Sequence, residues 1–145
     1  MLKSARLGLI VITAIASLSC QKYSTPLQQT VARADETAVV AALRSIGVAQ
    51  QTYSISSGGT YATLDQLRDG GYLDVRFNSA DGGVKDYALT VNTNPPGAGT
   101  PASFSCNADP TKTGPTAGRH FYIDSTSQAI HVNATQPATA TDPSY

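Results

Sequence analysis

The chain has 145 residues, of which 41% are hydrophobic and 14% are charged. That length suffices for one domain with a modest core and not for two. Basic and acidic residues number 10 each, and the basic ones are scattered along the sequence. Because binding to a phosphate backbone requires clustered positive charge, we expect no nucleic-acid partner.

The first residues have the layout of a secretory leader. Lys3 and Arg6 give a short positive region, and an apolar run follows from Leu7 to Ile15. This run is shorter than the ~20 apolar residues that a membrane-spanning helix requires. Small residues then lead to Cys20, which resembles a bacterial lipoprotein signal, in which the cysteine becomes the lipidated first residue of the mature protein. We therefore expect a signal peptide at 1–19, lipidation of Cys20 and a place in the cell envelope as a membrane-anchored lipoprotein.

The sequence also allows alternatives to cleavage and lipidation at Cys20. Ser17 stands three residues before Cys20, where lipoprotein signals carry an aliphatic residue. Secretion without lipid, to the periplasm or outside the cell, and a leader that is never cut are the alternatives. A disulfide between Cys20 and Cys106, the other cysteine, could form in an oxidising compartment but is incompatible with lipid on the Cys20 sulfur. Otherwise we expect Cys106 to be a small, buried and inert side chain, because no basic residue lies near it in sequence to lower its pKa.

A long helix is predicted after a short linker. Residues 20–29 are largely polar and contain Pro26, which predicts a tether. From Thr30 to Tyr53 apolar residues recur three or four apart, which predicts a helix of about 25 residues. The glycines after Ser56 favour its end there. The predicted apolar stripe consists of Val39, Ala42, Leu43, Ile46, Ala49 and Tyr53, and the predicted opposite side carries Arg33, Glu36, Arg44 and Gln51.

A short second helix is predicted next. Thr63 with Gln66 three residues on has the form of a capping box, in which each residue bonds to the backbone of the other. Leu64 and Leu67 share an inner side, and the glycine pair 70–71 supplies the stop.

Strands follow in the second half of the chain. Alternating apolar residues predict strands at Asp86–Asn92 and Ala102–Cys106. A hairpin is predicted around the turn Ser125–Gln128. Its register pairs Phe121 with Val132, Tyr122 with His131 and Ile123 with Ile130. Together these elements predict an α+β domain in which the long N-terminal helix packs on a small antiparallel sheet.

Chemical motifs are few. His120 and His131 become diagonal neighbours in the hairpin, but a zinc site requires further ligands that the sequence does not place nearby. No Ser, His and acid grouping has triad spacing, and no glycine-rich loop has the form that holds phosphate. Acidic residues in or beside turns are expected to be solvated surface and not a calcium site: Asp65, Asp69, Asp74 and Asp81. We expect no catalytic residues, no metal, no cofactor and no enzyme activity.

Several segments, in their order along the chain, resemble the type IV pilin-like and pseudopilin family. They are residues 35–46, 50–53, 59–67, 118–124 and 137–143. The resemblance implies a long helix on an antiparallel sheet, and pilus or secretion-system proteins as partners. The N-terminus departs from the family pattern, because cleavage at Gly8 would put Thr13 where pilins carry a glutamate, and because Pro26 interrupts the apolar run.

The expected organisation is a signal peptide at 1–19, a tether at 20–29, a pilin-like domain at 30–133 and a C-terminal tail at 134–145. The expected function is that of a non-enzymatic envelope protein, held at the membrane by a lipid anchor and acting in surface or envelope assembly through protein contacts. One alternative is a pseudopilin subunit of a type IV pilus or type II secretion system. Another is a periplasmic ligand-binding module that uses the loop Asn92–Pro101.

Overall fold

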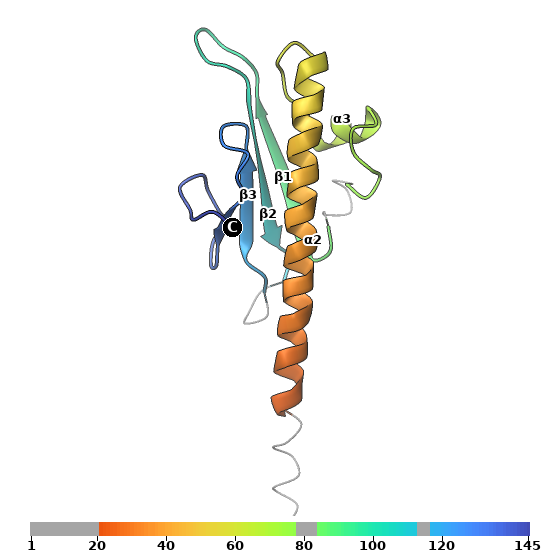
Figure 1. Cartoon of the computed structure of the whole chain (residues 1–145), viewed down its shortest axis with the longest axis vertical. Coiled ribbons are helices and arrows are strands. Elements are labelled where there is room, and N and C mark those ends of the chain that lie inside the picture. Colours follow the sequence, from red (N-terminus) through yellow and green to blue (C-terminus); the bar gives the residue numbers. More distant parts are fainter. Residues whose placement is uncertain (1–20, 78–83, 113–116) are drawn as a thin grey trace, which may run out of the picture.

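The computed structural model describes residues 21–77, 84–112 and 117–145, so the predicted leader, Cys20 and Asp81 lie outside it. Two helices, α2 (Gln21–Ser56) and α3 (Leu64–Asp69), precede four strands. The strands are β1 (Tyr87–Asn94), β2 (Ser103–Pro110), β3 (His120–Asp124) and β4 (His131–Asn133), and they form one antiparallel sheet in the order β1-β2-β3-β4. Helix α2 lies along this sheet and extends past its end (Figure 1). The prediction of an α+β fold with a long helix on a small antiparallel sheet is confirmed.

The predicted apolar stripe of α2 forms the centre of the core. Val39, Leu43 and Ile46 are fully buried, Ala42 and Ala49 nearly so, and Tyr53 packs against them half-buried. Helix α2 contacts β2, β3 and α3. The same chain therefore covers the apolar side of its own long helix.

The long helix reaches further toward the N-terminus than predicted, because residues 21–29, which the sequence predicts to be a tether, are helical. Proline has no N–H, so Pro26 removes one bond of the helical ladder, and its ring crowds the carbonyl one turn earlier. The segment contains no glycine and no other proline, and its glutamines, lysine and leucine are good helix formers. One proline is therefore not enough to end the helix here.

Helix α3 has the capping box that the sequence predicts. The Thr63 hydroxyl accepts a bond from the Gln66 N–H at 3.3 Å, and the Thr63 N–H donates to the Gln66 side chain at 2.9 Å. Leu64 and Leu67 are buried. Gly71, directly after the helix cap, has a φ of 76°, a value that glycine adopts without strain.

The predicted hairpin register is also confirmed. Phe121 lies opposite Val132 and Tyr122 opposite His131. The strand predicted at Asp86–Asn92 runs from Tyr87 to Asn94, and the strand predicted at Ala102–Cys106 runs from Ser103 to Pro110. Both predicted strands are thus present, with bounds shifted toward the C-terminus.

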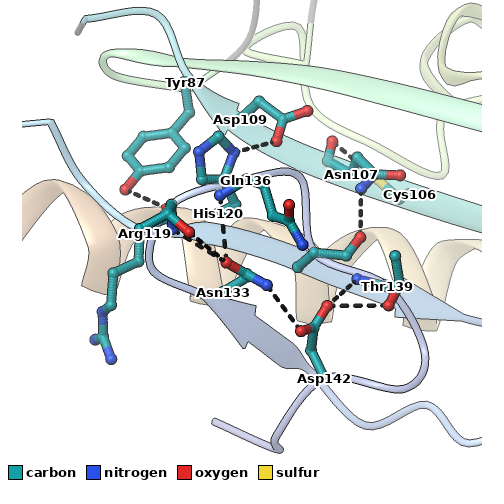
Figure 2. A network of polar contacts seen from close by, with 12 residues as sticks. Tyr87, Cys106, Asn107, Asp109, Arg119, His120, Asn133, Gln136, Thr139 and Asp142 are labelled. Atoms are coloured by element: carbon teal, nitrogen blue, oxygen red, sulfur yellow. Dashed lines mark hydrogen bonds and ion pairs between the residues drawn. The ribbon is translucent and has the colours of Figure 1, made fainter.

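The C-terminal tail is part of the folded unit. The Val132 N–H donates to the Pro143 carbonyl at 2.9 Å, and the Tyr145 N–H donates to the Ile130 carbonyl at 2.8 Å. Figure 2 shows Asp142 of the tail accepting bonds from Thr139 in the same segment and from Asn133 of β4. The tail therefore closes the sheet along the outer edge of β4.

Candidate functional site

The first part of α2 carries two exposed apolar side chains, Leu27 and Val31. We call residues 21–35 of α2 the stalk, which protrudes past the sheet in Figure 1. Leu27 is 70% exposed and Val31 is 57% exposed. These residues are four apart and so lie on one side of the helix. Adjacent exposed apolar residues on a rod of this kind are typical of a surface that contacts another protein.

A groove of about 390 Å³ runs between the stalk and the nearby end of the sheet. Leu27 and Val31 line it from the helix, and Tyr87 and Pro110 line it from β1 and β2. Lys112, which is paired with Asp86 in an ion pair, gives the groove a charged border. An apolar floor with a charged border is typical of a protein contact.

An ion pair joins α2 to the residue directly before β3, where the stalk meets the domain. The Arg119 guanidinium donates to the Glu36 carboxylate at 2.8 Å, and the Arg119 backbone N–H donates to it at 2.9 Å. The guanidinium also lies 5.3 Å from the ring centre of Tyr145 and 5.8 Å from that of Phe121. The Tyr87 hydroxyl donates to the Arg119 carbonyl at 2.9 Å, and burial raises the pKa of Tyr87, which keeps this donor protonated. Glu36, Arg119 and Tyr87 thus fix the direction in which the stalk leaves the sheet.

The burial of Glu36 corrects its predicted place on the exposed side of the helix, because only 7% of its surface is exposed. Glu36 falls three residues before Val39 and seven before Leu43, in the series that forms the core. This spacing is the signal that could have shown it to be buried. The predicted stripe also missed Gln50, which lies four residues after Ile46 and is fully buried.

Glu36 makes the stability of the fold depend on pH. Burial by itself raises the pKa of Glu36, but the bonds from Arg119, its charge and that of Arg33 outweigh this and bring the pKa below the ordinary 4.5. A lowered folded pKa stabilises the fold above the unfolded value, and this contribution is lost as the pH falls through the folded pKa. At pH 7 we expect Glu36→Gln to lower the free energy of unfolding by about 1–2 kcal/mol, since Arg119 is partly exposed to solvent.

The measurement is urea unfolding of the wild type and Glu36→Gln at pH 7 and at about pH 3. The difference between the two proteins should shrink in acid, because protonated Glu36 resembles glutamine in charge. A difference of the same size at both pH values would show that the ion pair does not stabilise the fold.

The two histidines do not form a joint site. His120 Nδ1 lies 2.6 Å from an Asp109 carboxylate oxygen (Figure 2). His131 Nδ1 lies 2.7 Å from the Asp142 carbonyl oxygen. In the residues that the structure describes, no three His, Cys, Asp or Glu side chains are placed to hold a metal ion. Cys106 is fully buried, and burial followed by the charge of Asp109 raises its pKa to about 12. Such a thiol is not a nucleophile at neutral pH.

The acidic residues singled out from the sequence have local roles. Asp65 and Asp69 form ion pairs with Arg68 on α3. Asp74 accepts a bond from the Arg76 N–H at 2.9 Å. These contacts stay within one short stretch of chain and do not converge on a common point.

The loop of the ligand-binding alternative projects from the sheet. Its first residues, Asn92–Asn94, belong to β1, and residues 95–101 are exposed. Backbone bonds between Gly97 and Thr100 close its turn. No polar side chains converge in this loop to bind a small molecule.

Comparisons with protein-family models, with curated proteins and with solved structures find no match for this chain. Over the described ranges 21–77, 84–112 and 117–145, no helix combines the length and apolar character required to cross a membrane.

Proposed function

We propose that this chain is a non-enzymatic envelope protein, anchored through lipid on Cys20, whose pilin-like domain acts in surface or envelope assembly through protein contacts. The observation that carries the proposal is that α2 is helical from Gln21, the first described residue, and continues without a break into the core. At a rise of 1.5 Å per residue, the stalk holds the sheet about 22 Å from the anchor. The apolar groove at the stalk faces a partner within this span.

The anchor requires more than one acyl chain. One chain binds a bilayer only weakly and reversibly, whereas two or more give stable attachment. Bacterial lipoproteins carry several chains on the modified cysteine, which meets this requirement. The ion pair of Glu36 with Arg119 then matters because it sets the angle between the anchored rod and the domain.

Replacing Cys20 by Ser in the full chain tests the anchor. The wild type should sediment with membranes and be released by detergent, whereas Cys20→Ser should appear in the soluble envelope fraction. Cys106→Ala is the matched control, because it removes the other thiol and should stay with the membranes. Immunoblotting of the two fractions checks this prediction. If Cys20→Ser stays with the membranes, the lipid anchor is wrong.

A second candidate is a pseudopilin subunit inserted through its N-terminal segment. The helicity of residues 21–29 favours it, because an inserted subunit requires a helix that continues out of the membrane toward the domain. Thr13, at the position where pilins carry a glutamate, disfavours this candidate. Retention of Cys20→Ser in the membrane fraction is the result that this candidate predicts.

A further inference from the structure

The two edges of the sheet differ in whether another segment of the chain is hydrogen-bonded to them. The outer edge of β4 is covered by the C-terminal segment, through the bonds between Val132 and Pro143 and between Ile130 and Tyr145. Strand β1 is the other edge. Within the described residues, nothing pairs with the outer side of β1 beyond its first residue. In the part of the chain that the structure describes, one edge is thus closed and the other is open.

The open backbone groups of β1 can be identified from its ladder. The Thr111 N–H donates to the Asp86 carbonyl at 2.8 Å, so Asp86 and every second residue after it face β2. The residues between them face outward, and the Tyr87 N–H does so, donating to the Val84 carbonyl at 3.2 Å. The outward backbone groups beyond that bond belong to Leu89, Val91 and Thr93.

The sequence of β1 lacks the features that keep edge strands apart. Natural edges are protected by lysine, by proline or by bulges. From Tyr87 to Asn94 the strand reads Tyr-Ala-Leu-Thr-Val-Asn-Thr-Asn, with no charge, no proline and no glycine. The nearest lysine, Lys85, precedes the strand, and the nearest proline, Pro95, follows it. The open part of this edge, after Tyr87, is suited by its composition to pairing with another strand.

We propose that β1 pairs antiparallel with β1 of a second copy of this chain, about a twofold axis at Val91. In this register Val91 lies opposite the partner's Val91, and Leu89 lies opposite the partner's Thr93. Leu89, Val91 and Thr93 then all belong to hydrogen-bonded pairs, each exchanging two bonds. A register centred on Thr90 is poorer, because it pairs Thr93 with Tyr87, whose N–H is already bonded to Val84.

The two faces of the joined sheet match in this register. Side chains alternate between the two faces along a strand. In this register the two residues of each pair have equal numbers or numbers that differ by an even number, so their side chains lie on the same face of the joined sheet. Thr90 therefore lies opposite the partner's Asn92 on the outer face, where both are exposed. The strand is uncharged, so no like charges meet across the axis. The second copy thus fits the edge in hydrogen bonding, in side-chain alternation and in charge.

The dimer has a consequence for the stalks. Strand β1 runs alongside α2 in Figure 1, so antiparallel pairing points the two stalks in opposite directions. Two copies that are both anchored at their N-termini would then join two facing membrane surfaces. The pairing itself does not depend on the anchor and is tested without it.

Disulfide trapping tests the register in the full chain carrying Cys20→Ser. Thr90→Cys and Asn92→Cys are made separately, and one of the two carries an affinity tag. Opposed residues in a non-hydrogen-bonded pair have Cα atoms about 4.5 Å apart, within reach of a disulfide. Mixing the two variants under mild oxidation should give at least about tenfold more covalent dimer than either variant alone. In a single variant the two cysteines occupy the same position in both copies, and these positions lie diagonally across the axis at ~7–8 Å.

Non-reducing electrophoresis and mass spectrometry of the cross-linked peptide provide the readout. The buried Cys106 does not compete for the new thiols. Covalent dimer from Thr90→Cys alone, in the amount seen for the mixture, would overturn the Val91 register. No covalent dimer in any sample would overturn the pairing.

A charge variant tests the association without cross-linking. Thr90→Lys combined with Asn92→Lys places a lysine opposite the partner's lysine at two symmetry-related positions, which should raise the dimer dissociation constant by about tenfold or more. Thr37→Lys combined with Ala41→Lys is the matched control, since both residues are exposed on α2 and the added charge is equal. Sedimentation velocity over a concentration series measures each constant. A wild type that stays monomeric at about 1 mM would overturn the proposal, as would a dimer that the β1 lysines leave unchanged.

Discussion

Replacing Leu43 by Ala is expected to lower the free energy of unfolding by about 3–5 kcal/mol. Leu43 is fully buried at the middle of the apolar stripe of α2, where the helix packs on the sheet. Alanine removes the side chain beyond Cβ and leaves a cavity that the surrounding strands cannot fill. Urea unfolding followed by circular dichroism measures the loss.

Val48→Ala is the matched control on the same helix. Val48 is 64% exposed, so its truncation should change stability by no more than about 0.5 kcal/mol. Equal losses for Leu43→Ala and Val48→Ala would mean that the stripe is not covered by the sheet of the same molecule. Both substitutions shorten an aliphatic side chain of α2 to alanine, and the two sites differ in burial.

Replacing Gln50 by Ala is expected to have the second large effect, about 2–5 kcal/mol. The Gln50 side chain donates to the Ala62 carbonyl at 2.6 Å and accepts from the Ala62 N–H at 2.9 Å, and both residues are fully buried. Alanine at position 50 leaves both backbone groups of Ala62 without a partner inside the core. An unpaired buried polar group costs about 1–3 kcal/mol, which is why two together are so destabilising.

The adjacent Gln51 provides the control, because it has the same side chain but is exposed. Gln51→Ala should be nearly neutral in the same unfolding experiment. Hydrogen exchange adds a local readout, since the Ala62 amide should lose protection in Gln50→Ala. Full protection of that amide, or similar losses for both variants, would contradict the role given to Gln50.

Local patterns in the sequence predicted most of the fold, because the signals for these elements are local. The Thr63 capping box lies within one helical turn, and the hairpin register follows from alternation on both sides of one turn. Helix and strand periodicity likewise predicted α2 and the core residues, Val39 and Leu43 among them.

The burial of the two polar residues in α2 depends on partners that are far away in the sequence. Glu36 is buried because Arg119, 83 residues later, bonds to its carboxylate. Gln50 is buried because Ala62, beyond the end of the helix, presents both of its backbone groups. No local pattern contains these partners, so polarity alone placed Glu36 on the wrong side and passed over Gln50.

The extent of α2 changes how the candidate site is understood. A flexible tether would have left the domain free to turn, whereas a helix from Gln21 gives a rod with a defined direction. The groove that includes Leu27 and Val31 exists only because this rod stands beside β1 and β2. The predicted site residue, Cys20, precedes Gln21 in the sequence and lies outside the described residues.

The mass of the N-terminal peptide of the native protein tests this account most directly. Membranes would be extracted with detergent, and the purified chain would be digested and analysed by mass spectrometry. A mature chain that begins at Cys20 and carries several acyl chains is the predicted result. An unmodified Cys20, a disulfide from it to Cys106, or a chain that starts at another residue would contradict the lipid-anchored stalk.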